Sequence, residues 1–351
     1  MSFLIYGAYG YTGALIAREA EARGLTPTLA GRDADQLDAL AGELDLPCRA
    51  FALDDRAALS DAVAEADLVL NCAGPFARTA QPVVEACLRG GAHYLDITGE
   101  IAVFEQIAAQ DSRAKAAGVM LMPGVGFDVV PTDCLAAHLH QQQPDAAYLE
   151  LAIFGVGGVS RGTARTAALN AGRGGAIRTG GRIRRVPAAW RTRRVDFGRG
   201  PTEVVSIPWG DVATAWRTTG IPTIVTYAKL PDTAVRAMRL SRYVGPLLRT
   251  RPAQAFLETL VKERIPGGPD AQTREKGRSF VWGKASTKGG RAAKARLRGP
   301  ETYALTVQTA LAATERTLQG DDAAPGYQTP AGRFGADFIL EIDGAHREDL
   351  A

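Results

Sequence analysis

The chain has 351 residues, of which 46% are hydrophobic and 23% charged, and its formal net charge is +3. The length suits two domains, the composition is that of a globular protein, and the small net charge argues against a general polyanion binder. No stretch approaches the roughly 18 consecutive apolar residues of a membrane span. Because a strand is predicted from residue 3, we expect no cleaved leader. The scattered cysteines, without a C-x-x-C pair, predict reduced thiols in a cytoplasmic protein and no metal site.

The first predicted element is a short strand over residues 3–6, which three glycines and a helix over 14–22 follow. This order is typical of the β-α unit that holds a dinucleotide, in which the helix N-terminus points at the pyrophosphate. The glycine spacing is wider than in G-x-G-x-x-G, but its place directly after a strand favours a nucleotide site over a structural turn. The predicted cofactor-binding residues of this loop are Gly7, Ala8, Tyr9, Gly10, Tyr11, Thr12 and Gly13.

A second predicted strand, residues 27–30, runs into Gly31 and Arg32. Proteins that bind NAD usually place an acidic residue here to bind the ribose 2′-hydroxyl, whereas a guanidinium pairs with the 2′-phosphate of NADP. The sequence therefore predicts NADP(H), with Arg32 at the phosphate. The alternative is that Arg32 only leads into the next helix, 34–44, which Asp33 is expected to cap.

Strands and helices alternate up to residue 131, which predicts an α/β, Rossmann-type domain with a doubly wound parallel sheet over residues 1–131. The further strands are expected over 49–53, 68–72, 93–97 and 119–122, and the further helices over 55–64, 82–89 and 103–117. Ligands of such sheets bind outside the carboxyl ends of the strands. At one of these ends Ala73, Gly74, Pro75 and Phe76 are predicted to lie against the cofactor.

Residues 132–325 are predicted to form a second, α+β domain for substrate binding and dimerisation, with a mostly antiparallel sheet. Its strands are expected over 148–155, 181–186, 193–197, 202–209, 221–230, 280–287 and 291–297, and its helices over 132–140, 163–176 and 302–318. The tail, 326–351, carries a predicted short helix and strand over 330–342. Whether this tail returns to the first domain stays open.

Residues 231–266 form an insert in the second domain. Its apolar residues Val235, Met238, Val244, Leu247 and Leu248 alternate with arginines, which predicts an amphipathic basic segment interrupted at Gly245-Pro246, and a second helix is expected over 253–264. Three roles stay open: a helix pair packed on its own domain or in a homodimer, a lid over a lipophilic substrate, and a peripheral contact with a membrane surface.

Residues 161–199 contain eleven arginines and one acidic residue. A solvated face explains this excess, and a site for the phosphate of a CoA or carrier-protein substrate is the alternative. Because no nucleic-acid-binding module or aromatic stacking platform accompanies the charge, we expect no nucleic-acid partner.

The glycine loop occurs together with four further stretches in a fixed order: Ala30-Gly31-Arg32, the segment 71–76 ending Gly74-Pro75-Phe76, the segment 93–100 ending Thr98-Gly99-Glu100, and the segment 123–128 ending Gly126-Phe127-Asp128. This set resembles the saccharopine dehydrogenase-like oxidoreductases, a family with a branch of trans-acting enoyl reductases. The resemblance covers the first 135 residues, and less specific likeness follows at 162–164 and 326–330. It implies NADP binding and a reductase fold and leaves the substrate open.

Hydride transfer requires a positioned proton donor when the product takes up a proton. Two carboxylates follow predicted strand ends and are our candidate catalytic residues: Glu100, beside Gly99, and Asp128. For each, the alternative role is to cap the following helix. Tyr94 and Asp96 lie within a predicted strand and are expected to orient their neighbours.

The sequence thus favours an NADPH-dependent oxidoreductase that transfers a hydride to an unsaturated small-molecule substrate, lipophilic or acyl-linked, as in an enoyl reductase. One alternative is a reductase acting on an imine or carbonyl of a small polar metabolite. The other is an NADP-binding scaffold or membrane-associated protein without turnover. No tyrosine is followed four residues later by a lysine, which excludes the Tyr-x-x-x-Lys mechanism of short-chain dehydrogenases.

Overall fold

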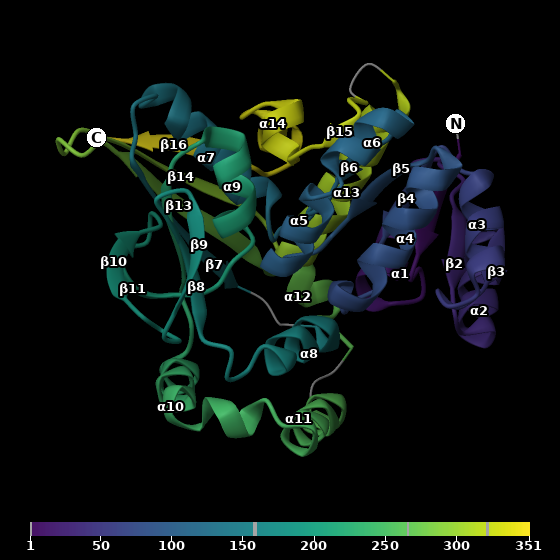
Figure 1. Cartoon of the computed structure of the whole chain (residues 1–351), viewed down its shortest axis with the longest axis horizontal. Coiled ribbons are helices and arrows are strands. Elements are labelled where there is room, and N and C mark those ends of the chain that lie inside the picture. The colour runs from purple at the N-terminus through teal and green to yellow at the C-terminus, as the bar shows by residue number, and fades with distance from the viewer. Residues whose placement is uncertain (1, 157–159, 265–266, 321–322) are drawn as a thin grey trace. The chain divides into compact units, whose positions relative to one another are not determined.

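The computed structural model describes residues 2–156, 160–264, 267–320 and 323–351 (Figure 1). The chain forms two units: Met1–Val130 with Leu305–Phe334, and Pro131–Ala304 with Gly335–Ala351. The boundary predicted at residue 325 is therefore wrong, because most of helix α13 (Thr302–Leu318) and the first residues of the tail belong to the first unit.

The first unit contains a seven-stranded sheet in the order β15-β6-β5-β4-β1-β2-β3, and all its recorded strand pairs are parallel. Strands one to six follow the 3-2-1-4-5-6 order of a Rossmann-type sheet, which confirms the predicted fold class. The strands are β1 (Phe3–Tyr6), β2 (Thr28–Gly31), β3 (Cys48–Ala50), β4 (Leu68–Asn71), β5 (His93–Asp96), β6 (Met120–Met122) and β15 (Gly326–Tyr327).

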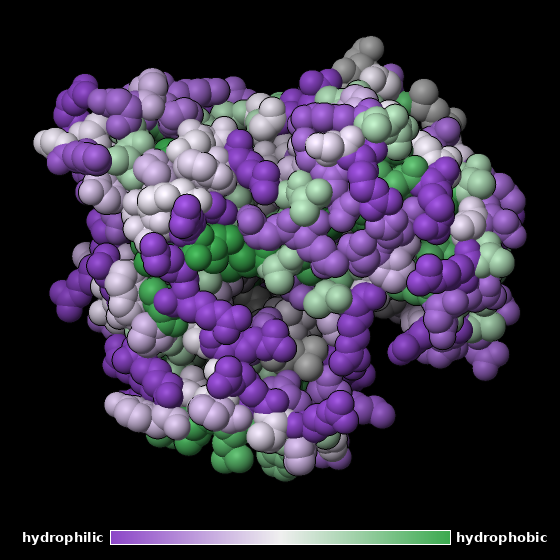
Figure 2. All heavy atoms as spheres, viewed as in Figure 1, coloured by the Kyte–Doolittle hydropathy of each residue, from purple (hydrophilic) through white to green (hydrophobic). Residues whose placement is uncertain are grey.

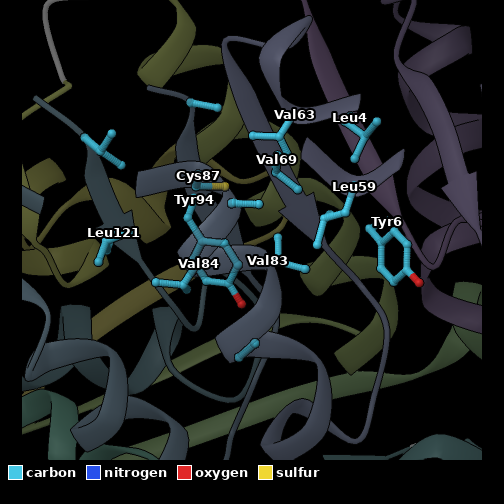
Figure 3. Close-up of a cluster of buried hydrophobic side chains, with 14 of the residues drawn as sticks. Leu4, Tyr6, Leu59, Val63, Val69, Val83, Val84, Cys87, Tyr94 and Leu121 are labelled. Carbon is cyan, nitrogen blue, oxygen red and sulfur yellow. The ribbon is translucent and has the colours of Figure 1, made fainter. Parts of the chain in front are cut away.

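Both faces of this sheet are buried, as expected when crossover helices cover a parallel sheet. On β1, Leu4 and Tyr6 point to one face and Phe3 and Ile5 to the other, and all four are buried. Figure 3 shows the core on the first of these faces, where side chains of α3 and α4 pack on the sheet. The helices of the unit, besides α13, are α1 (Tyr11–Ala22), α2 (Ala34–Leu44), α3 (Arg56–Ala64), α4 (Phe76–Gly90), α5 (Ile101–Ala108), α6 (Asp111–Ala117) and α14 (Pro330–Phe334).

Two helices of the first unit differ from the prediction. Helix α4 begins at Phe76, so Pro82 lies inside it and removes one backbone hydrogen bond of the helix. The helix expected over 103–117 is divided, because the Gln110 N–H bonds to the Ile107 carbonyl oxygen, 2.9 Å away, in a tightened turn between α5 and α6.

The second unit contains a nine-stranded sheet in the order β10-β11-β12-β7-β13-β14-β16, with β8 paired to β12 and β9 paired to β8. Among the described residues, only β12 and β7 pair in parallel, so the predicted, mostly antiparallel sheet is confirmed. Its strands are β7 (Tyr148–Val156), β8 (Gly175–Thr179), β9 (Arg182–Val186), β10 (Thr192–Asp196), β11 (Pro201–Ser206), β12 (Thr223–Ala228), β13 (Arg278–Ser286), β14 (Ala292–Pro300) and β16 (His346–Leu350).

The helices of the second unit correct two predictions. The helix expected over 163–176 ends at 169, since Gly172 and Gly174 adopt positive φ angles. Helix α10 runs through Gly245-Pro246 without interruption. The helices are α7 (Val130–Gln142), α8 (Arg161–Leu169), α9 (Asp211–Thr219), α10 (Asp232–Leu248), α11 (Arg251–Arg264), α12 (Ala271–Lys276) and the 3₁₀ helix η1 (Phe338–Glu341).

The tail is divided between the units. Gly326 and Tyr327 pair with β6 of the first sheet, whereas β16 pairs with β14 of the second. The strand expected near residue 340 is the 3₁₀ helix η1. Residues 265 and 266 of the predicted insert lie outside the described residues, and no helix within the described ranges is long and apolar enough to cross a membrane.

Candidate active site

The loop between β1 and α1 is as tight as the glycine pattern predicts. Gly7 N and Ala8 N both donate to the Ala30 carbonyl oxygen, at 2.7 and 3.1 Å, which ties the loop to β2. Gly7 has φ +83°, and a Cβ added there would lie 2.8 Å from Ala73 N. A Cβ at Gly13 would lie 2.3 Å from the Gly7 carbonyl oxygen, so only a bare backbone lets α1 pack this closely.

Helix α1 presents its N-terminus to this loop. Its N-cap residue is Gly10, which makes no side-chain hydrogen bond to the first turn. The N–H groups of a first turn, with the positive end of the helix dipole, form a ready site for a phosphate. Tyr11, Thr12 and Gly13, predicted to bind the cofactor, lie in that turn.

The end of β2 carries the residues that we expect to distinguish NADP from NAD. Gly31 lies beneath Tyr9, because a Cβ at Gly31 would be 2.4 Å from Tyr9 Cε1. Asp33 caps α2 by accepting from Gln36 N at 3.2 Å. Arg32 is exposed. Both predicted roles are therefore compatible, since the cap uses Asp33 and leaves the Arg32 guanidinium to face solvent.

The loop between β4 and α4 contains the other predicted cofactor residues, Ala73, Gly74, Pro75 and Phe76. Ala73 N donates to Asn71 Oδ1 at 3.0 Å, and Thr79 Oγ1 donates to the Ala73 carbonyl oxygen at 2.5 Å. Together with the Gly7–Ala73 approach, these bonds bring this loop against the glycine loop. The two stretches that the sequence assigns to the cofactor are thus adjacent.

A buried polar network connects the ends of three strands. Asp96 accepts from Tyr94 Oη at 2.7 Å, from Thr98 N at 3.0 Å and from Gly124 N at 2.9 Å. The Tyr94 hydroxyl accepts in turn from Asn71 Nδ2 at 3.3 Å. Burial raises the pKa of Asp96 to about 6, against the lowering effect of these bonds. The network fixes the strand ends, as expected of Tyr94 and Asp96.

Asn71 is the member of this network that the sequence interpretation missed. It is a fully buried polar residue at the end of an otherwise apolar strand. Such a residue needs hydrogen-bond partners inside the protein. An asparagine at the end of an apolar strand was therefore the sequence signal for a buried polar network. Identifying the partners required the strand order, which places β4 beside β5.

Glu100 connects two of the strand-end loops. Its Oε1 accepts from Phe76 N at 2.9 Å, so the carboxylate holds the first turn of α4 instead of capping its own helix, α5. Its own N–H donates to Thr98 Oγ1 at 3.1 Å. The side chain is half-buried and lies beside the predicted cofactor loop.

Asp128 lies in the turn between β6 and α7 and is half-buried. Its carboxylate lies against Gly99, where an added Cβ would be 2.4 Å from Asp128 Oδ2. Burial raises the pKa of Asp128 from 3.8 to about 7. A carboxyl group whose pKa lies near neutrality can both donate and accept a proton there, as a general acid–base residue must.

The structure therefore gathers the predicted residues of the first unit at the carboxyl ends of its strands. The glycine loop contacts the β4–α4 loop, Glu100 joins that loop to the end of β5, and Asp128 packs on Gly99. His93 lies at the other end of β5, where its Nδ1 accepts from Met120 N at 3.1 Å. His93 therefore has a structural position, away from the gathered strand ends.

These residues fit NADP(H). The closeness of Gly7 to Ala73 leaves no room for side chains where a pyrophosphate approaches the backbone, α1 offers its N-terminus, and Arg32 is available for a 2′-phosphate. The described residues contain no group of three or more His, Cys, Asp or Glu that could hold a metal ion.

Comparison with known proteins agrees with this arrangement. The chain is 29% identical over 157 residues to a trans-acting enoyl reductase of Mycobacterium ulcerans, covering 42% of this chain and 38% of that protein. It is 33% identical over 147 residues to a probable mitochondrial saccharopine dehydrogenase-like oxidoreductase of Arabidopsis thaliana, covering 37% and 32%. The chain thus aligns with only about a third of the length of each relative.

A solved structure of apo saccharopine dehydrogenase (L-Glu forming) from Saccharomyces cerevisiae has a TM-score of 0.71 to this chain, with 14% identity and all of both chains covered. This likeness shows a shared fold. Residues 3–122 match the family model of the saccharopine dehydrogenase NADP binding domain, which confirms the predicted cofactor. Over residues 3–122 the chain is thus similar to the NADP-binding domain of the saccharopine dehydrogenase-like family.

Proposed function

We propose that the chain is an NADPH-dependent oxidoreductase in which Asp128 donates the proton that accompanies hydride transfer. The observation that carries this proposal is the position of Asp128: a half-buried carboxyl group, with a pKa of about 7, among the strand ends of an NADP-binding domain. Perturbed carboxyl groups at the edge of a cofactor site are typical of catalytic acids and bases.

The protein must supply a proton in such a reaction. NADPH, when bound, supplies a hydride. Reduction of a carbon–carbon double bond places that hydride on one carbon and requires a proton at the other. With a pKa of about 7, Asp128 is protonated in about half of the molecules at neutral pH. Its carboxyl oxygen can release the proton to the substrate and regain one from solvent, since the side chain is only half-buried.

Glu100 has a different part in this proposal. Its carboxylate accepts a hydrogen bond from the Phe76 N–H at 2.9 Å, in the first turn of α4. We assign Glu100 to holding the β4–α4 loop, where the cofactor is expected, and leave proton donation to Asp128. Of the two predicted catalytic carboxylates, one thus positions the site and the other reacts.

The substrate that we propose is an α,β-unsaturated acyl compound of lipophilic character. The enoyl reductase name of the mycobacterial relative supports this choice. An imine or carbonyl reductase of a small polar metabolite would use the same acid and cofactor. A protein that binds NADP without turnover would retain the loops but need no carboxyl group with a pKa near 7.

Asp128→Asn tests the assignment in a spectrophotometric assay of NADPH consumption with an enoyl-CoA, a cyclic imine and an aldehyde as substrates. Loss of a general acid lowers kcat by about 100-fold or more, while NADPH binding, followed by fluorescence, should not change. Asp61→Asn, on an exposed position of α3, is the matched control and should keep the wild-type rate. An Asp128→Asn variant with full activity would contradict the proposal, and NADPH binding without turnover of any substrate would favour the scaffold.

The compartment stays a prediction. The scattered cysteines predict a cytoplasmic protein, whereas the name of the Arabidopsis relative describes that protein as a probable mitochondrial oxidoreductase. Localisation of the full chain fused to a fluorescent protein would decide between these compartments.

A further inference from the structure

Helix α10 turns an apolar stripe towards solvent. The stripe consists of Leu240, Tyr243, Val244 and Leu247, which are 63%, 84%, 38% and 64% exposed. Their spacing, i, i+3, i+4 and i+7, places them on one face of the helix. Scattered exposed apolar residues need no explanation, but a continuous stripe of this kind indicates an interaction surface.

The opposite face of α10 holds the helix in this orientation. Arg242 donates from its guanidinium to the carbonyl oxygens of Ala188 and Ala189, both at 2.7 Å. Gly245 is buried against Gly172, since a Cβ added at Gly245 would lie 2.9 Å from the Gly172 carbonyl oxygen. Because this face contacts the rest of its own unit, rotation of the helix cannot bury the stripe.

Helix α11 continues the apolar surface. Phe256 and Leu260 are 67% and 40% exposed and lie one helical turn apart. The other side of α11 contacts α8 through an ion pair of Glu258 with Arg165 at 3.4 Å, and Gln254 Nε2 donates to the Leu248 carbonyl oxygen at 2.6 Å. Figure 2 shows hydrophobic residues along the lower edge of the molecule, where Figure 1 places α10 and α11.

Basic residues surround this surface. Residues 232–264 contain seven Lys or Arg against three Asp or Glu, and one of these acids, Glu258, is already paired. Arg236 and Arg239 precede the stripe on α10, Arg249 directly follows α10, and Arg251 begins α11; all four are exposed. Apolar residues that include Tyr and Phe, flanked by arginines, are the composition of helices that lie in a membrane interface.

We propose that α10 and α11 bind the surface of an anionic lipid bilayer, with the stripe, Phe256 and Leu260 in the acyl–headgroup boundary and the arginines at the lipid phosphates. This proposal is independent of the proposed catalysis. A second copy of the chain fits the surface less well, because a two-fold interface would bring the same basic helices together, and like charges across an interface oppose association.

Flotation with lipid vesicles tests the proposal on the full chain. We expect flotation with phosphatidylcholine vesicles that contain about 30% phosphatidylserine, much weaker flotation with pure phosphatidylcholine, and release by salt. Arg236→Gln and Arg239→Gln should each weaken binding about fivefold. The double variant Tyr243→Ser/Leu247→Ser should weaken it about tenfold or more.

Two matched variants serve as controls. Leu340→Ser changes another exposed leucine, on η1, and Arg184→Gln/Arg185→Gln changes two exposed arginines on β9. Neither should alter flotation, and circular dichroism should show every variant folded, since the substituted side chains are exposed. The proposal is overturned if the wild-type chain does not float, if it floats equally with neutral vesicles, or if the controls lose binding equally. Sedimentation velocity that shows a dimer, dispersed by Tyr243→Ser/Leu247→Ser, would also overturn it and assign the stripe to a second copy.

Discussion

Replacement of Gly7 by alanine tests whether the glycine loop and the β4–α4 loop meet as the structure shows. Two costs add at this position. The residue has φ +83°, and a left-handed backbone costs an L-residue about 1–2 kcal/mol. The new Cβ would also lie 2.8 Å from both N and Cβ of Ala73, and such overpacking against backbone typically costs about 1–3 kcal/mol. We therefore expect a loss of about 2–5 kcal/mol in the free energy of unfolding.

Gly24 provides the control, because it separates the two costs. It also has a positive φ, +74°, but nothing lies within 4 Å of an added Cβ. Gly24→Ala should therefore lose only the conformational part, about 1–2 kcal/mol. Urea denaturation of both variants measures the difference. Gly7→Ala should in addition weaken NADPH binding, whereas Gly24→Ala should not. Equal stabilities for the two variants would refute the close approach of the two loops.

Three further predictions follow from the same unit. Arg32→Ala should weaken NADPH binding about 10–100-fold by removing charge-assisted hydrogen bonds to the 2′-phosphate and leave NADH binding unchanged; equal losses for both cofactors would refute the NADP assignment of Arg32. Tyr94→Phe should destabilise the fold by about 1–3 kcal/mol, since it removes one buried hydrogen bond each from Asp96 and Asn71, and unaltered urea denaturation would contradict the network. Asp128 has its pKa raised from 3.8 to about 7, so the folded state binds the extra proton and loses stability as pH rises between these values. Asp128→Asn should then be more stable than the wild type at about pH 8, by about 2–4 kcal/mol, and show no such gain below about pH 4; a gain independent of pH would refute the burial argument.

The sequence predicts most accurately the helices and turns that neighbouring residues determine. Helix α2 lies over 34–44 as expected, because Asp33 caps its start and an Asp in left-handed conformation ends it. The strand–glycine–helix order at residues 3–22 likewise needs no distant partner. The Gly7–Ala73 approach depends in contrast on β1 lying beside β4, whereas the sequence predicted only that both loops face the cofactor.

Long-range contacts explain most of what sequence analysis missed. Gly326 pairs with Met120, 206 positions earlier. No local sequence pattern predicts that β15 joins the first sheet. Phe127 N donates to Thr306 Oγ1 at 3.1 Å, one of the contacts that assign α13 to the first unit. Periodicity gave the amphipathic character of the insert but not the face that points outward, which depends on what Arg242 contacts.

The pH dependence of kcat tests the central claim most directly. If Asp128 donates the proton, kcat with saturating NADPH and an enoyl substrate is constant in acid and falls tenfold per pH unit above about pH 7, where the pKa of Asp128 lies. Asp128→Asn should abolish this decrease of kcat above about pH 7 (the alkaline limb of the profile) and leave a low rate that does not change with pH across the same range. A wild-type profile without a limb near neutrality, or the same limb in Asp128→Asn, would contradict the account.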